Sequence, residues 1–206
     1  MLKIWGRLTS LNVRKVVWTA QELGLAFERI DAGRQFGLVD TPDYRAMNPN
    51  GLVPVLEDDG YVLWESNTIV RYLCSCHGGE ALFPAAPRER FDAERWMDWQ
   101  QTTLNPASGG AFVQWIRTAP EQRSQAVIDA SVAKMAPLLA MLDQHLATRT
   151  FMTGENFSVA DIPIGCDVHR WYGLPQARPS HPNLDRWFAA ISARPAVKGV
   201  FDIPLA

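Results

Sequence analysis

The chain has 206 residues, of which 47% are hydrophobic and 20% are charged, and its formal net charge is -2 at pH 7. This composition is ordinary for a globular protein, and the length allows one large domain or two small ones. Because the basic residues are dispersed and nearly balanced by acidic ones, we expect no nucleic-acid partner and no anionic membrane surface. The sequence also predicts no signal peptide and no apolar run of transmembrane length.

The cysteines and histidines indicate neither a disulfide framework nor a metal site. Cys74, Cys76 and Cys166 form an odd set without a C-x-x-C pair, and the four histidines are scattered along the chain. Metal sites place such ligands at short, regular spacings, which are missing here. We therefore expect no metal, and a reducing cytoplasm is the simplest location.

The first third of the chain predicts an α/β module. Leu2 to Trp5 is a short apolar strand candidate, apolar residues at helical spacing follow over 13–23, and Phe27 to Ile30 has strand character again. Residues 32–51 are expected to form a loop. Two further strands, 53–57 and 61–63, flank a hairpin turn at Asp58-Asp59-Gly60.

Ser66 is then expected to cap a helix that carries Ile69, Val70 and Leu73. The resulting order, β-α-β followed by β-β-α, matches a thioredoxin-like domain over residues 1–79. A stretch rich in glycine and proline follows, between His77 and Pro87, and indicates a linker.

Beyond the linker the pattern is helical, which predicts an all-α C-terminal domain over residues 88–206. The expected helices are 88–101, 122–147, 159–172 and 184–192. Ser158 and Asp161 form an S-x-x-D capping box, in which the serine hydroxyl accepts from the Asp161 amide and the carboxylate reaches back. A structural role for Asp161 is therefore favoured over a functional one.

The segment Asn48-Pro49-Asn50-Gly51-Leu52-Val53-Pro54-Val55-Leu56, followed by Glu65-Ser66, is the most informative feature of the chain. It predicts a turn, a strand marked by proline, a hairpin, and then an acidic residue and a hydroxyl at the start of a helix. Because backbone groups and a helix N-terminus converge there, the arrangement suits the binding of a small peptide-like anion.

Together with several other motifs, this segment resembles the cytosolic-type glutathione transferases. The motifs follow the family's order over nearly the whole chain: Ser10-x-Asn12-Val13-x-Lys15-Val16, Glu22-Leu23-Gly24-Leu25, Asn48-Pro49-Asn50-Gly51-x-Val53-Pro54, Glu65-Ser66, Ser158-x-x-Asp161 and Arg194-Pro195. The resemblance implies a thioredoxin-like domain that binds glutathione, a helical domain that shapes a second pocket, and a homodimer.

The resemblance also implies residue roles. Ser10 stands where serine-type members place the hydroxyl that activates the thiol, and Asn12 is an auxiliary donor. Glutathione must react as the thiolate, because the thiol is a poor nucleophile. The position of Ser10 permits a simple helix cap equally well, and Thr9 is the alternative hydroxyl.

The glutathione-binding residues follow from the same resemblance. Val53, before a cis Pro54, is expected to pair with the peptide backbone; Glu65 is expected to meet the γ-glutamyl ammonium, and Ser66 with its helix N-terminus the carboxylate. At the position of Leu52, many relatives carry a polar or basic side chain that helps to hold glutathione.

Because Leu52 supplies no charge, Arg34 and Gln35 are the residues expected to reach the glycyl carboxylate instead; Arg34 as a solvated loop charge is the alternative. The second-substrate pocket is expected to be apolar and aromatic, with the candidates Leu8, Phe112, Trp115 and Trp171, although tryptophans in a helical protein more often belong to the core than to a substrate site.

The sequence thus predicts a transferase that conjugates glutathione to a small, largely apolar electrophile. Glutathione-dependent peroxidase or disulfide-reductase chemistry would use the same thiolate. A non-catalytic ligand carrier or interaction module on the same fold is the hypothesis from a different class.

Overall fold

Four short strands form the sheet of the N-terminal part in a computed structural model that describes residues 1–206. They are β1 (Leu2–Trp5), β2 (Phe27–Ile30), β3 (Val55–Asp58) and β4 (Tyr61–Trp64), in the order β2-β1-β3-β4. β1 is parallel to β2 and antiparallel to β3, and β3 is antiparallel to β4. This mixed sheet confirms the expected thioredoxin-like arrangement.

The predicted hairpin joins β3 and β4. Asp59 has a φ of 46° and Gly60 a φ of 91°, and such positive values at both central residues match the right-handed twist of the flanking strands. β3 begins at Val55, because the two residues before it belong to a loop that contains a cis Val53–Pro54 peptide bond. The expected strand 53–57 is therefore shifted toward the turn.

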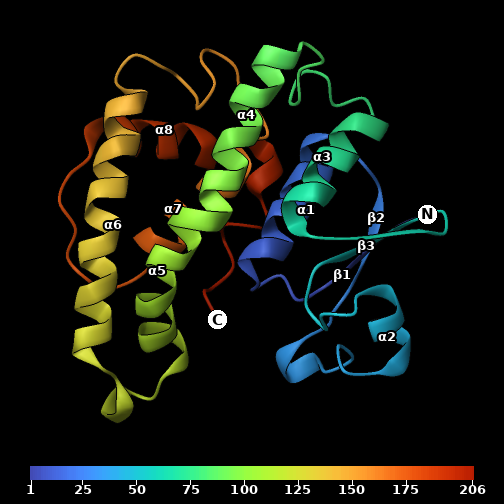
Figure 1. Ribbon diagram of the computed structural model, residues 1–206, viewed down its shortest axis with the longest axis horizontal. Helices are drawn as coiled ribbons and strands as arrows, with labels where there is room; N and C mark the ends of the chain where they lie inside the picture. Colours follow the sequence, from blue (N-terminus) through green and yellow to red (C-terminus); the bar gives the residue numbers. More distant parts are fainter. The chain divides into compact units, whose positions relative to one another are not determined.

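Two helices of this part contact each other, as Figure 1 also shows: α1 (Leu11–Glu22) and α3 (Ser66–Cys76). The apolar stripe of α1 is buried, and Val13 and Val16 are fully excluded from solvent. Within this contact, Lys15 Nζ donates to Asn67 Oδ1 over 3.3 Å. The two helices that precede and follow the candidate binding loop are thereby held together.

The expected loop 32–51 contains structure that the sequence analysis missed. A 3-10 turn, η1 (Arg34–Phe36), is followed by the short helix α2 (Pro42–Met47). Thr41 caps α2 by accepting from the Tyr44 amide, and Pro42 occupies the first turn, where no intrahelical donor is required. A threonine followed by proline was the available signal.

The chain divides into two compact units, residues 1–83 with 196–203 and residues 84–195 with 204–206. The segment 196–203 belongs with the first unit because Gln21 donates to the Lys198 carbonyl and the Phe201 ring packs on Trp18 with centroids 5.0 Å apart. The structure therefore differs here from the expected helical domain over 88–206.

The second unit is helical, as expected. Its helices are α4 (Pro87–Trp99), α5 (Asn105–Phe112), α6 (Gln125–Leu146), α7 (Asp161–Tyr172) and α8 (Pro182–Ser192). Two π-helical turns, η2 (Gln100–Leu104) and η3 (Val113–Arg117), flank α5. Two 3-10 turns are also present: η4 (Pro120–Gln122) precedes α6, and η5 (Pro195–Val197) follows α8. α5 lies against α6, and α6 also packs against α8 (Figure 1).

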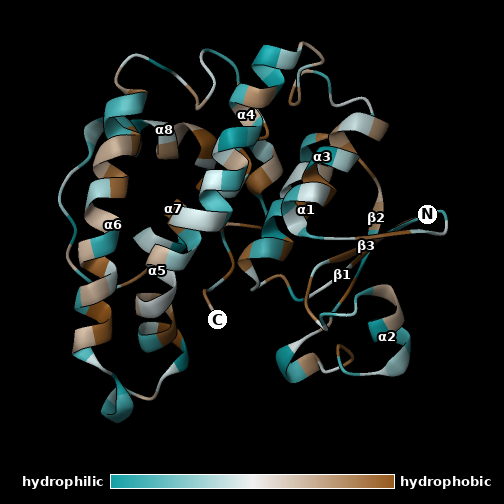
Figure 2. Ribbon diagram, viewed as in Figure 1, coloured by the Kyte–Doolittle hydropathy of each residue, from teal (hydrophilic) through white to brown (hydrophobic).

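α6 is long and apolar enough to cross a membrane, by length and composition only. This differs from the expectation that no such segment exists. Figure 2 shows apolar and polar residues intermixed along α6, and 28% of its most apolar window is buried. Met135, Leu139 and Leu142 lie on the buried face, a spacing that is also typical of a bundle helix.

The capping box before α7 is present in modified form. The Ser158 amide donates to Asp161 Oδ2 over 2.8 Å, which confirms the predicted reach of the carboxylate. The Ser158 hydroxyl, however, accepts from the Ala160 amide instead of the Asp161 amide. Asp161 Oδ1 accepts from the Met152 amide and from Trp187 Nε1. This carboxylate is fully buried, and burial raises its pKa to about 6 despite these donors.

Candidate functional site

The first unit contains a pocket of about 400 Å³ between the end of β1 and the loops that precede η1 and β3. Its lining residues are Arg7, Ser10, Asn12, Gly33, Arg34, Val39, Gly51, Leu52 and Val53. Four residues of the sequence-based site are among them, namely Ser10, Asn12, Arg34 and Val53. Pro54, Glu65, Ser66 and Gln35 are not, although Pro54 directly follows the lining segment.

Ser10 stands at the N-cap position of α1, but its side chain makes no capping hydrogen bond. Its main chain is fixed, because its amide donates to the Arg7 carbonyl over 3.1 Å and its carbonyl accepts from the Arg14 amide over 3.0 Å. The side chain of Ser10 is thus held at the pocket wall while its hydroxyl remains available. Beside it, Asn12 Oδ1 is buried without a hydrogen-bond partner.

The loop before Val53 is held by hydrogen bonds to its backbone. The Leu52 carbonyl accepts from Tyr44 Oη over 2.9 Å and from Asn48 Nδ2 over 2.8 Å. Tyr44 is 2% exposed, and burial raises its pKa to about 12, so it remains a donor at neutral pH. Because both bonds hold the Leu52 carbonyl, the neighbouring Val53 is kept at the pocket wall by a fixed loop.

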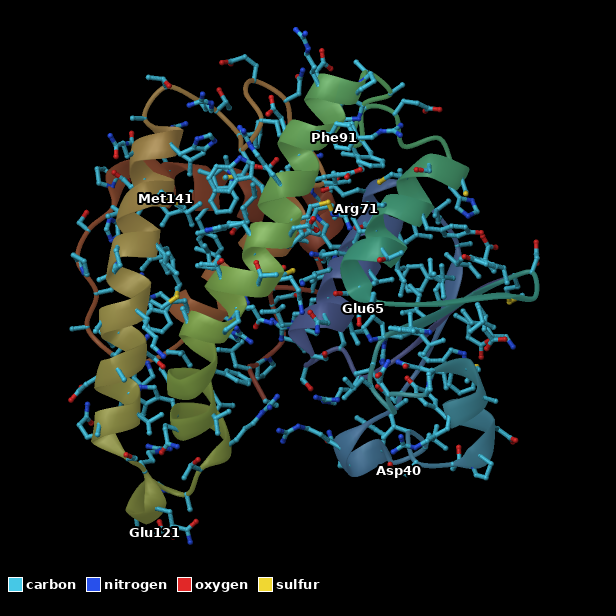
Figure 3. All side chains as sticks on the ribbon, in the orientation of Figure 1. Asp40, Glu65, Arg71, Phe91, Glu121 and Met141 are labelled. Atoms are coloured by element: carbon cyan, nitrogen blue, oxygen red, sulfur yellow. The ribbon has the colours of Figure 1, made fainter.

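Glu65 and Ser66 lie together at the start of α3, outside the lining of this pocket. Glu65 is the N-cap residue with a φ of 73°, a left-handed conformation that is strained for a side chain other than glycine. Ser66 is the first helical residue, so the expectation that it caps the helix is wrong. Figure 3 shows Glu65 at this end of α3, where amide donors of the first turn point outward.

Arg7 lines the pocket and was missed by the sequence analysis. β1 and β2 are parallel, so the residues that follow them meet at one edge of the sheet. The Arg7 amide donates to the Ala32 carbonyl over 3.1 Å, which fixes the loop of Arg34 beside it. A basic residue shortly after each of two parallel strands was the signal that identifies this pair.

Comparison with known proteins places the two units in one family. The model for the glutathione S-transferase N-terminal domain matches residues 9–76, and the model for the C-terminal domain of the same enzymes matches residues 81–195. The chain belongs to the glutathione S-transferase family.

Individual members of the glutathione S-transferase family are similar over the full length. Glutathione S-transferase GstB of Escherichia coli K12 is 44% identical over 207 residues, covering 100% of both chains. Glutathione S-transferase 4 of Zea mays is 30% identical and covers 97% of this chain and 91% of its own. The crystal structure of the theta class glutathione S-transferase from Xanthomonas axonopodis pv. citri with glutathione bound superposes with a TM-score of 0.96 at 42% identity, covering 100% of this chain and 99% of that one.

The candidates for the second-substrate pocket of this transferase differ in exposure. Phe112 in α5 is 5% exposed and Trp171 in α7 is 2% exposed, so both offer little surface to a substrate. Trp115 in η3 is partly exposed, with the Arg123 guanidinium 5.1 Å from the centre of its ring. Leu8, in the first unit, is also partly exposed. Core packing is the better account of Phe112 and Trp171.

The cysteines of this transferase lie outside the pocket. All three are free, with Cys74 and Cys166 buried and Cys76 exposed. Burial raises the pKa of the Cys74 thiol to about 12, which keeps it unreactive near neutral pH. No group of three or more His, Cys, Asp or Glu side chains is placed to hold a metal ion. The chemistry available in the pocket is that of a hydroxyl, an amide, guanidinium groups and backbone.

Proposed function

We propose that this protein is a glutathione transferase that conjugates the glutathione thiolate to a small, largely apolar electrophile. The observation that carries the proposal is the uncapped Ser10 hydroxyl, which lines the same pocket as Val53. A hydroxyl and a strand-like backbone segment are what a thiol-bearing tripeptide requires for activation and alignment. The family membership supplies the reaction class.

Activation of the thiol has a defined energetic requirement. A free cysteine-like thiol has a pKa of about 8.5, and lowering it by about two units requires roughly 2.7 kcal/mol of preferential stabilisation of the anion. Ser10 donates its hydroxyl hydrogen to the sulfur, and the N-terminal amides of α1 add positive potential. The thiol proton leaves to solvent, and the sulfur lone pair then forms the bond to the electrophilic carbon. The electron pair of the bond that breaks at this carbon departs with the leaving group or, in an addition, moves to the neighbouring atom of the electrophile, which takes a proton from solvent.

The rest of glutathione is held by groups on either side of this pocket. The Val53 amide and carbonyl pair in antiparallel fashion with the cysteinyl backbone of glutathione. Glu65 binds the γ-glutamyl ammonium, and Ser66 with the first amides of α3 binds the γ-glutamyl carboxylate. Asn12 orients Ser10 or contacts the sulfur, Arg34 binds the glycyl carboxylate with Gln35 beside it, and Leu8 contacts the electrophile.

A cytoplasmic homodimer with a role in detoxification is part of the same proposal. The free cysteines support a reducing compartment. β4 has no strand on its outer side and exposes Tyr61, Val62 and Trp64, an apolar edge of the kind that a second copy would cover. Sedimentation velocity of the purified protein tests the dimer, and a monomer at micromolar concentration would contradict it.

An ultraviolet titration of enzyme-bound glutathione tests the function, with the wild type measured beside Ser10→Ala. We expect thiolate absorbance at a pH about two units below that of free glutathione, and a return toward the free value in the variant. The conjugation rate of the variant near neutral pH is expected to fall by up to about 100-fold, because less thiolate is present.

The other outcomes separate the alternatives. Binding with the same thiol pKa in both proteins would remove Ser10 from activation and leave Thr9 or Asn12 as the donor. A wild type that binds no glutathione would overturn the transferase and favour a non-catalytic carrier. Peroxide reduction faster than conjugation would assign the same thiolate to peroxidase chemistry.

A further inference from the structure

Two arginines of the first unit, Arg7 and Arg34, meet at the pocket without a carboxylate between them. They follow parallel strands, and the main-chain hydrogen bond from Arg7 to Ala32 holds the two loops at one edge of the sheet. No acidic residue lines the pocket. A Cβ atom placed on Gly33 would lie 2.8 Å from Arg7 Nη1, so the guanidinium passes directly over this glycine toward the loop of Arg34.

Three other arginines of the same unit bind carbonyl or carboxylate groups of the protein. Arg14 donates to the Leu8 and Ile203 carbonyls. Arg29 is bound to Asp31 and to the Gly6 carbonyl, and Arg45 pairs with Asp40 over 2.7 Å.

Arg7, by contrast, has a buried Nε atom without a hydrogen-bond partner. Burial, and secondarily the charge of Arg34, lower its pKa. Two like charges at a partly buried wall are unfavourable on their own and are relieved by an anion.

Leu52 also lines the pocket and adds no charge to it. Its side chain is 64% exposed, and its carbonyl is already occupied by Tyr44 and Asn48. The cationic groups of the pocket therefore come from the strand ends and not from the loop before Val53. The pocket places its positive charge on one side, next to Gly33.

We propose that Arg7 is the principal ligand of the glycyl carboxylate of glutathione, with Arg34 as the second cation. This inference rests on the proposed function and names the group that replaces the charge missing at Leu52. Glutathione carries two carboxylates, and the γ-glutamyl one is directed to the start of α3, whose residues do not line this pocket. The glycyl carboxylate is the one that remains for the two guanidinium groups, which bind carboxylates in a forked geometry.

The test combines Arg7→Met with esterification of the ligand. KM and kcat are measured for glutathione and for its monoethyl ester, in which the glycyl carboxyl carries no charge. In the wild type we expect the ester to have a KM about 10- to 100-fold above that of glutathione, because charge-assisted hydrogen bonds are lost. Arg7→Met should raise the KM for glutathione by a similar factor, change the KM for the ester less than twofold, and leave kcat and the bound thiol pKa unchanged.

Two further variants serve as controls. Arg88→Met removes an exposed arginine from the first turn of α4 and should change nothing. Arg7→Lys keeps the charge without the fork and should recover part of the loss. If Arg7→Met is poorly folded, Arg34→Met with the same two ligands gives the same comparison with a smaller effect.

Each contrary result overturns the inference in a recognisable way. Equal binding of acid and ester by the wild type would show that no cation recognises the glycyl carboxylate. Equal losses for acid and ester in Arg7→Met, with a raised thiol pKa and a lower kcat, would assign Arg7 to the sulfur. Failure of the proposed function is distinct, since the wild type would then bind neither ligand.

Discussion

Ser10 is the N-cap of α1 in the first unit, Ser158 lies two residues before the N-cap of α7 in the second, and their side chains make different contacts. The Ser158 amide donates a hydrogen bond to the Asp161 carboxylate, and the Ser158 hydroxyl accepts one from the Ala160 amide. The Ser10 amide donates to the Arg7 carbonyl and its carbonyl accepts from the Arg14 amide, but its hydroxyl caps nothing, and Ser10 lines a pocket. The amide and hydroxyl of Ser158 are both engaged in hydrogen bonds within the fold. The main chain of Ser10 is held in place, and its hydroxyl makes no capping hydrogen bond.

The surroundings of the two serines differ in the same sense. Asp161 beside Ser158 accepts from the Met152 amide, the Ser158 amide and Trp187 Nε1, so donors and acceptor satisfy one another. Beside Ser10, Asn12 Oδ1 and Arg7 Nε are buried and have no partner. Unsatisfied polar groups are unfavourable in a folded protein unless a ligand completes them. The difference therefore separates a structural anchor from a binding site.

The largest expected effect comes from breaking the anchor. Asp161→Ala leaves the Met152 amide, the Ser158 amide and Trp187 Nε1 buried without an acceptor. We expect the free energy of unfolding to fall by about 3 to 5 kcal/mol, because each buried unsatisfied donor costs about 1 to 3 kcal/mol and the losses overlap. Urea denaturation measures it, and a loss below about 1 kcal/mol would contradict the role assigned to this carboxylate.

The pH dependence of stability gives the next effect. Burial raises the Asp161 pKa from 3.8 to about 6, so between these values the folded state holds a proton that the unfolded state has released. Stability from this group is therefore full below about pH 4 and is lost as the pH rises to about 6, a change of about 3 kcal/mol.

The matched measurement is the difference in unfolding free energy between the wild type and Asp161→Asn across pH 4 to 7, since the amide does not titrate. We expect this difference to move against the wild type as the pH rises. A flat difference would show that the donors around Asp161 offset its burial, and a difference that moves in favour of the wild type would show that they outweigh it.

The smallest expected effect is the difference in unfolding free energy between the alanine variants of the two serines. Ser158→Ala removes a hydroxyl that caps, and we expect a loss of about 1 kcal/mol in unfolding free energy with conjugation kinetics unchanged. Ser10→Ala removes one that caps nothing, and its unfolding free energy should stay within about 0.5 kcal/mol of the wild type. The comparison fails if Ser10→Ala proves the more destabilising of the pair.

Much of the fold could be predicted from local patterns. Residues 2–5 and 27–30 were assigned to strands with the bounds that the structure has, because each is a short segment that begins and ends with a large apolar residue and lies before turn residues. The hairpin at Asp59-Gly60 followed from residues that tolerate positive φ. α2 was missed because six residues are too few to show a recognisable helical period of apolar side chains. The available signal was Thr41 followed by Pro42, which are typical of a helix start.

The candidate site was predicted less completely, for a physical reason. Ser10, Asn12 and Val53 were named from motifs and Arg34 as a replacement for the charge missing at Leu52, and all four line the pocket. Arg7 was not named, because its importance depends on the parallel pairing of two strands that are more than twenty residues apart in sequence. Ser66 was assigned to the cap of α3, whereas Glu65 occupies it in a left-handed conformation that sequence patterns rarely indicate.

The sequence by itself determined the family, the α/β and helical halves, and the residue types that an activated thiol requires, because these depend on local periodicity and on short motifs. Only the tertiary structure decided which polar groups remain available. Whether a polar side chain is already hydrogen-bonded depends on partners brought together by packing: Trp187 donates to the Asp161 carboxylate, whereas no partner reaches Arg7 Nε. A serine near the N-terminus of a helix thus became an anchor in one unit and a candidate catalytic group in the other.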